Sequence, residues 1–76
     1  MNTETKLVSI ISTVLSLQKE KVTKELSQEN EKAWDSVNHL LLINEIEKEF
    51  KLTIPLEASI TLTSYKKILD FLNKHA

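Results

Sequence analysis

The stretch Trp34-Asp35-Ser36-Val37, followed by the apolar-periodic run from Asn38 to Phe50, decides the fold of this chain. The apolar members of the run recur with the period of an α-helix, so we predict a helix from about Ser36 to Phe50. We expect its core-facing residues to be Leu40, Leu42, Ile43, Ile46 and Phe50. A helix start offers unpaired backbone N–H groups and the positive end of the helix dipole, which makes it a good place to attach a phosphate.

Asp35 and Ser36 are both residue types that cap helices, so the pattern alone leaves two interpretations open. In the first, one of the two residues accepts a hydrogen bond from the first turn and has no further role. In the second, the Ser36 hydroxyl carries a phosphate-linked group. The residues at the helix start do not decide between these interpretations, and the rest of the chain must do so.

The length and composition of the chain limit what it can do. Its 76 residues are expected to form a single domain, residues 1–76, which buries only about 60% of the surface of the unfolded chain. Such a domain is too small for a deep catalytic cleft, so we expect a binding or carrier protein and not an enzyme. The sequence has no cysteine, which excludes disulfides, a thiolate nucleophile and a cysteine zinc site.

The charge and hydropathy of the chain exclude further classes. Ten basic and eleven acidic side chains nearly cancel, which argues against the basic footprint of a nucleic-acid-binding protein. No long apolar run or signal-like segment is present, so we expect a cytoplasmic protein without membrane insertion. Glycine is absent and proline occurs once, which favours continuous helices over hairpins.

The segments on either side of the central helix also have helical patterning. We predict a first helix capped by Thr3 and ending near Leu17, then a long polar loop from Gln18 to Trp34. Three apolar residues are expected to hold the loop on the core: Val22, Leu26 and Trp34. After the central helix, Lys51 is expected to take a left-handed conformation.

The C-terminal third of the chain is predicted to contain a short helix and a long one. One helical turn is expected over Leu56 to Ile60, and a last helix after Thr63 or Ser64 as its cap. The predicted fold is therefore all-α, a small four-helix bundle of three main helices and one short helix.

The ordered set Asp-Ser-Val at 35–37, Ile-Glu-Lys-Glu-Phe at 46–50 and Leu-Thr-Ile-Pro at 52–55 resembles the acyl carrier protein family. The resemblance covers nearly the whole chain. It implies that Ser36 carries a covalent 4′-phosphopantetheine arm, whose thiol holds acyl groups as thioesters. It also implies that Asp35 helps to present Ser36 to a phosphopantetheinyl transferase, which uses coenzyme A and magnesium. Because the chain has no cysteine, this arm would have to supply the thiol.

The resemblance further implies a docking surface for acyl-loading and acyl-transfer enzymes on the outer side of the central helix. The residues at these positions are Val37, Leu41, Asn44, Glu45, Glu47, Lys48 and Glu49. Leu41 and Lys48 occupy positions that are acidic in the family, so we expect weaker electrostatic steering and more apolar contact. From the helical pattern alone, Val37 and Leu41 are either exposed partner contacts or covered by the preceding loop. These departures favour a specialised pathway, secondary or in polysaccharide or lipid synthesis.

Several expectations complete the prediction. His39 could face the arm or the mouth of the apolar interior, but we expect it to be solvated or capping. Glu47 is expected to pair with Lys51 one turn later. The space that shelters an acyl chain is expected to be lined by Leu40, Ile43, Ile46, Phe50, Ile54, Leu62, Ile68 and Leu72. We expect a monomeric acyl carrier. The alternatives are an aminoacyl or peptidyl carrier and an unmodified helical adaptor.

Overall fold

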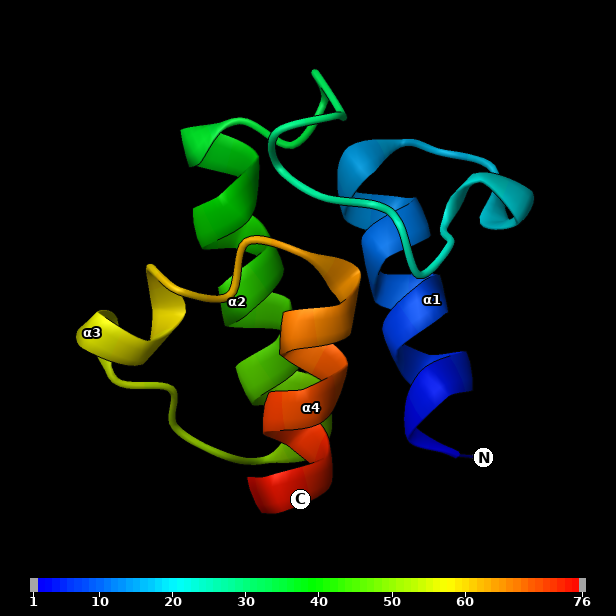
Figure 1. Ribbon diagram of the computed structural model, residues 1–76. Helices are drawn as coiled ribbons and strands as arrows, with labels where there is room; N and C mark the ends of the chain where they lie inside the picture. The colour runs from blue at the N-terminus through cyan, green and yellow to red at the C-terminus, as the bar shows by residue number, and fades with distance from the viewer. Residues whose placement is uncertain (1, 76) are drawn as a thin grey trace.

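Four α-helices and one 3-10 turn form the protein in a computed structural model that describes residues 2–75. The elements are α1 (Thr3–Leu15), η1 (Lys19–Lys21), α2 (Ser36–Phe50), α3 (Leu56–Ser59) and α4 (Tyr65–His75). Helix α1 runs in the opposite direction to α2 and α4 (Figure 1). The predicted all-α class and the division into three main helices and one short helix are confirmed.

The ends of α1 differ slightly from the prediction. Its cap is Asn2, whose side chain accepts a hydrogen bond from the backbone of the first turn, and not Thr3, which is the first helical residue. The helix ends at Leu15 because Ser16 takes a left-handed conformation with φ 55°. The predicted end at Leu17 was therefore wrong, although Leu17 still packs against the core from beyond the helix.

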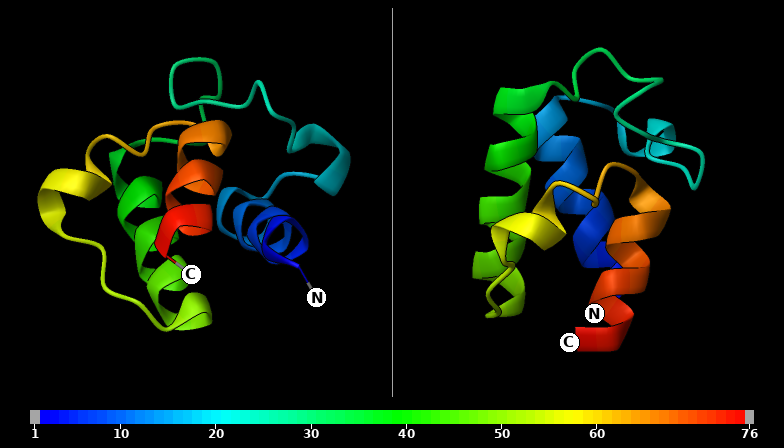
Figure 2. Two further views of the ribbon diagram at one scale, coloured as in Figure 1. Left: turned by 60° about the horizontal axis from the view of Figure 1, so that its bottom comes forward. Right: turned by 60° about the vertical axis from the view of Figure 1, so that its left-hand side comes forward.

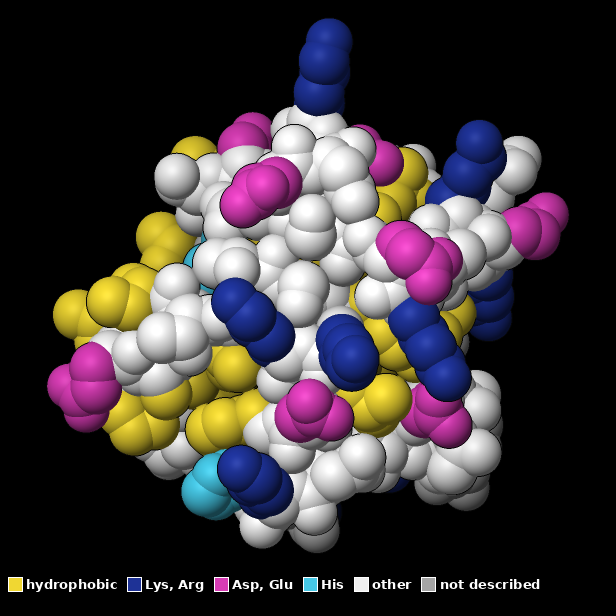
Figure 3. Space-filling view, viewed as in Figure 1, with side chains coloured by type: hydrophobic (Ala, Val, Ile, Leu, Met, Phe, Trp, Pro, Cys, Tyr) yellow, Lys and Arg dark blue, Asp and Glu magenta, His cyan; other side chains and the backbone are white. Residues whose placement is uncertain are grey.

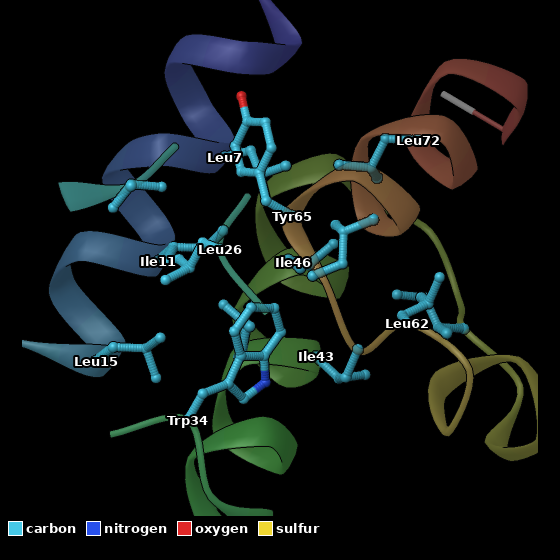
Figure 4. Packing of buried hydrophobic residues seen from close by; sticks show 14 residues of the cluster. Leu7, Ile11, Leu15, Leu26, Trp34, Ile43, Ile46, Leu62, Tyr65 and Leu72 are labelled. Atoms are coloured by element: carbon cyan, nitrogen blue, oxygen red, sulfur yellow. The ribbon is translucent and has the colours of Figure 1, made fainter. Parts of the chain in front are cut away.

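The hydrophobic core lies between α1, α2 and α4, and loop residues close it at one end (Figure 4). Its fully buried side chains are Leu7, Ile11, Trp34, Leu42, Ile46, Ile68 and Leu72. The loop residues Val22, Leu26 and Trp34 are all buried, as predicted. The packing role expected of Trp34 is confirmed, because its side chain is only 1% exposed.

The long loop between α1 and α2 is tied to the start of α4. The backbone N–H of Gln28 donates to the Thr63 carbonyl at 2.8 Å, and the N–H of Tyr65 donates to the Leu26 carbonyl at 3.0 Å. These bonds satisfy polar backbone groups that the loop would otherwise bury unpaired. The loop therefore has a fixed path, and it delivers the chain to the start of α2.

The connection from α2 to α4 must return along the bundle because these two helices run in the same direction (Figure 1). Lys51 ends α2 in a left-handed conformation with φ 54°, as expected. Glu47 does not pair with Lys51; its carboxylate instead accepts a hydrogen bond from the backbone N–H of Ile54 at 2.8 Å. Helix α3 follows and lies beside α2, on the side away from α1 (Figure 2).

Helix α4 begins after Ser64, whose hydroxyl accepts a hydrogen bond from the Lys67 N–H at 3.2 Å. This geometry selects Ser64 over Thr63 as the cap. Three of its side chains enter the core: Tyr65, Ile68 and Leu72. Within residues 2–75, every helix is too short or too polar to cross a lipid bilayer.

Candidate functional site

At the start of α2, one residue caps the helix and the next one has a free hydroxyl. Asp35 is the cap: its backbone is extended, and its carboxylate accepts a hydrogen bond from the Asn38 N–H at 2.8 Å. Ser36 is the first residue of the helix, and its side chain is exposed. Within residues 2–75 the Ser36 hydroxyl has no hydrogen-bond partner. The structure thus assigns the cap to Asp35 and leaves the neighbouring hydroxyl available to a reactant.

The electrostatic surroundings of Ser36 suit a phosphate ester. The first turn of α2 contains no acidic residue, and the Asp35 carboxylate at the cap occupies only one of the free donors there, the Asn38 N–H. The backbone N–H groups of Ser36 and Val37 have no acceptor among the described residues. A phosphate carried on this hydroxyl would lie near unpaired donors and a favourable dipole. Residues 2–75 contain no cluster of His, Cys, Asp or Glu that could hold a metal ion.

The segment before Ser36 is held by side-chain hydrogen bonds. The Asn38 side chain donates to the Ala33 carbonyl at 2.7 Å, and the Glu31 carboxylate accepts from the Ala33 N–H at 3.0 Å. The neighbouring indole of Trp34 is fixed in the core among side chains from α1 and α2 (Figure 4). Ser36 is therefore exposed, while the residues just before it are bound to the rest of the protein. This arrangement places its hydroxyl in a defined position.

His39 is buried, and its predicted solvated or capping role is wrong. Its side chain is only 8% exposed. The Trp34 indole N–H donates to its Nδ1 at 2.9 Å, and its Nε2 lies 2.8 Å from the Ser59 carbonyl oxygen. Position 39 belongs to the inward stripe of α2, three residues before Leu42 and seven before Ile46. This spacing indicates an inward position for residue 39. The prediction missed it because histidine is polar and was not counted among the apolar residues of the stripe.

The prediction that Leu40 faces the core is also wrong, because its side chain is 64% exposed. Since His39 occupies the inward position, Leu40 turns outward and does not line the interior. Leu40 lies with Val37 and Leu41 on α2, and all three are exposed. The preceding loop thus does not cover Val37 and Leu41, which decides between the two alternatives that the sequence left open.

The exposed large hydrophobic residues of the described chain all belong to α2 or to the α3 region. We call this set the apolar face, and its members are Val37, Leu40, Leu41, Leu56 and Ile60. In the space-filling view, hydrophobic side chains gather over α3 at the left-hand side (Figure 3). The segment from Ser36 to Asn44 contains no Lys, Arg, Asp or Glu. The α2 part of the apolar face therefore begins next to the exposed serine and contains no charged residue, whereas the exposed Glu57 stands between Leu56 and Ile60 in the sequence of the α3 part.

The other residues expected on the outer side of α2 divide into two groups. Asn44, Glu45 and Lys48 are exposed, and Lys48 lies 3.5 Å from Glu45 in an ion pair. Glu47 is half-buried and bound to the connection after α2, and the Glu49 carboxylate lies 3.8 Å from the Lys6 ammonium of α1. The two groups thus point to different parts of the molecule.

The observed fold and site define a small helical domain that presents one free serine at the start of its central helix. No family model matches the chain. It is similar to an acyl carrier protein of Buchnera aphidicola subsp. Schizaphis graminum, with 33% identity over 95% of this chain and 91% of the relative. It is also similar to acyl carrier proteins of Thermosynechococcus vestitus (35% identity, 90% and 84% covered) and of Guillardia theta (30%, 91% and 85%).

The chain therefore belongs to the acyl carrier protein family. Proteins of this family carry acyl groups for enzymes and are not enzymes themselves. The family normally carries 4′-phosphopantetheine, and the surroundings of Ser36 fit such a group: an exposed hydroxyl, unpaired N–H donors and no acidic residue in the first turn of α2.

Proposed function

We propose that the Ser36 hydroxyl is the attachment point of a 4′-phosphopantetheine arm and that the protein carries acyl groups on it. When bound, this group supplies the thiol on which acyl groups are held as thioesters. The chain itself contains no cysteine that could do so. The observation that supports the proposal most strongly is that Asp35 caps α2 while the neighbouring Ser36 stays exposed.

The attachment reaction is a phosphoryl transfer from coenzyme A, catalysed by a phosphopantetheinyl transferase with magnesium. The Ser36 oxygen forms the new bond to phosphorus, the pyrophosphate bond of coenzyme A breaks, and adenosine 3′,5′-bisphosphate leaves. The transferase takes up the proton of the hydroxyl. Asp35 contributes by fixing the backbone at position 36 through its bond to Asn38. We propose that this bond is how Asp35 presents the serine.

We further propose that partner enzymes dock on the outer side of α2. The residues that fit this role are Val37, Leu41, Asn44, Glu45 and Lys48, because all of them are exposed. Glu47 and Glu49, which the family resemblance also placed there, are engaged with other parts of the chain and are left out of the proposed contact. The apolar character near Ser36 supports recognition by a specialised set of acyl-loading and acyl-transfer enzymes, acting on a monomeric carrier.

The experiment that tests the proposal is a measurement of intact mass. The protein is incubated with coenzyme A, magnesium and a broad-specificity phosphopantetheinyl transferase, and the wild type should gain the mass of one phosphopantetheinyl group. Ser36→Ala should gain none. A wild type that gains no mass would support an unmodified helical adaptor instead. Loading of the modified protein by an amino-acid-adenylating enzyme, and not by an acyl-transferring one, would identify an aminoacyl or peptidyl carrier.

A further inference from the structure

His39 joins three elements that meet next to Ser36. Its ring stacks against the Trp34 indole at the end of the loop, with 6.1 Å between ring centroids. The ring itself belongs to α2, and its Nε2 reaches the Ser59 carbonyl at the end of α3. Both ring nitrogens therefore have a partner, one on either side of α2.

The two hydrogen bonds determine the form of the imidazole. The indole N–H of Trp34 is only a donor, so the Nδ1 of His39 must accept and carries no proton. Nε2 then carries the proton and donates to the Ser59 carbonyl. The imidazole is thus neutral, because a second proton on Nδ1 would point at the indole N–H. Protonation of the ring must break the bond to Trp34.

Helix α3 depends on this contact. Within residues 2–75, the bond from His39 to Ser59 is the hydrogen bond that joins α3 to another helix. The remaining hydrogen bonds of α3 are local, such as that from the Ile60 N–H to the Leu56 carbonyl. A helix of four residues has little stability of its own. Its position must therefore come from its contacts with the rest of the bundle.

We propose that His39 is a positioning residue that holds α3 against α2 and so keeps the two parts of the apolar face together. Leu40 follows His39 in the chain, and Ile60 follows Ser59, so the bond links the residue before Leu40 on α2 to the residue before Ile60 at the end of α3. The structural part of this inference stands on the geometry alone. Its consequence for partner enzymes rests on the function proposed for Ser36.

No acidic side chain on the described elements around His39 forms an ion pair with its imidazole. The candidates are Glu31 in the loop, Asp35 at the start of α2 and Glu57 on α3. Glu31 and Asp35 accept backbone hydrogen bonds, and Glu57 is exposed. Among the described residues, no carboxylate lies within ion-pair distance of the imidazole. A protonated His39 would have no nearby negative charge to compensate it.

The first test uses the fluorescence of Trp34, the single tryptophan of the chain. His39→Leu removes the acceptor of the indole N–H and should shift the emission maximum of Trp34 at a single fixed pH. His39→Gln, which offers a donor and an acceptor, should keep the emission close to that of the wild type. His75→Gln, which removes the other histidine at the end of α4, should leave the emission unchanged. A His39→Leu spectrum identical to that of the wild type would overturn the proposal.

The second test follows α3 directly by hydrogen exchange at the Ile60 N–H. His39→Leu removes both bonds of the ring and should increase exchange at Ile60 by roughly three- to tenfold, the loss of one ordinary hydrogen bond. Amides in the middle of α4 should not change, and His39→Gln should restore part of the protection. Equal acceleration in α3 and α4 would mean general destabilisation and would contradict a positioning role.

The consequence for enzymes is tested with the KM of the transferase for pairs of variants. If His39 acts through α3, then Ile60→Ser should raise KM in the wild type and have little further effect in His39→Leu. Leu41→Ser on α2 is the matched control, and its effect on KM should be as large in His39→Leu as in the wild type. Full additivity for Ile60 would contradict the proposal. A wild type that the transferase never modifies would contradict the function proposed for Ser36. The fluorescence and hydrogen-exchange measurements would still test the positioning role of His39.

Discussion

The carboxylate of Asp35 accepts a hydrogen bond from the backbone N–H of Asn38 at 2.8 Å. This bond satisfies one of the free donors of α2. The hydroxyl of Ser36 is therefore not needed for capping and stays exposed at the first helical position. The cap and the attachment point are two residues, so modification of the serine does not require the helix start to unravel.

Replacing the cap should cost stability. We expect Asp35→Ala to lower the free energy of unfolding by about 1 kcal/mol, because a first-turn N–H loses its acceptor. Asp35→Asn should lose much less, since an amide oxygen accepts the same bond. Urea denaturation followed by circular dichroism measures both values. An Asp35→Ala variant as stable as the wild type would show that the bond to Asn38 contributes nothing.

Leu41 and Leu42 are neighbours with opposite surroundings, and they form a matched pair for testing the docking surface. Leu41 is 51% exposed and Leu42 is fully buried. We expect Leu41→Glu to change stability by no more than about 0.5 kcal/mol while raising the KM of partner enzymes. Leu42→Ala should cost about 2–5 kcal/mol because it leaves a cavity.

Thermal unfolding and transfer kinetics separate the two effects. A large drop in melting temperature for Leu41→Glu would contradict its surface position. An unchanged KM in a stable Leu41→Glu variant would remove Leu41 from the proposed docking surface.

Tyr65 should make the fold sensitive to alkali. Burial raises the pKa of its hydroxyl, and the negative charge of Glu4 raises it further. The folded state thus favours the neutral phenol, so this contribution is complete below the unfolded pKa of about 10 and is lost as the pH rises through the higher folded pKa.

Tyr65 is the only tyrosine, so tyrosinate absorbance reports it directly. We expect a folded midpoint above that of the unfolded chain, and a smaller difference in Glu4→Gln. Equal midpoints in the folded and the unfolded protein would refute the effect of burial.

Partner recognition should depend little on salt. The segment from Ser36 to Asn44 has no Lys, Arg, Asp or Glu, and the two charged residues of the proposed docking surface, Glu45 and Lys48, already pair with each other at 3.5 Å. Screening by ions weakens contacts between charges and leaves apolar contacts largely intact. The KM of the transferase should therefore stay within about twofold between 0.05 and 0.5 M salt. A steep rise in KM with salt would show that ionic contacts dominate.

The features that could be predicted from the sequence are those with strong local or periodic signals. The Asp35-Ser36 pair stands at an abrupt change from a polar loop to a periodic helix, and this boundary is found where expected. Isolated apolar side chains in a polar loop can leave water only by packing on the core, and the predicted burial of Val22, Leu26 and Trp34 is confirmed. Lys51 took its left-handed conformation without glycine.

The features that could not be predicted depend on contacts between distant segments. Hydrophobicity placed Leu40 inside and His39 outside, whereas the structure has the reverse. The reason is tertiary: the buried indole N–H of Trp34 needs an acceptor, and the Ser59 carbonyl, which accepts from the Leu62 N–H, has room for a second donor. His39 provides both, and neither is visible in the sequence of α2 alone.

The central claim is that Ser36 carries the phosphopantetheine arm, and one peptide tests it most directly. Trypsin cleavage after Lys32 and Lys48 releases residues 33–48, in which Ser36 is the only side chain with a hydroxyl. After incubation with coenzyme A, magnesium and the transferase, this peptide should gain one phosphopantetheinyl mass. An unmodified peptide 33–48, or the added mass on any other peptide, would contradict the claim.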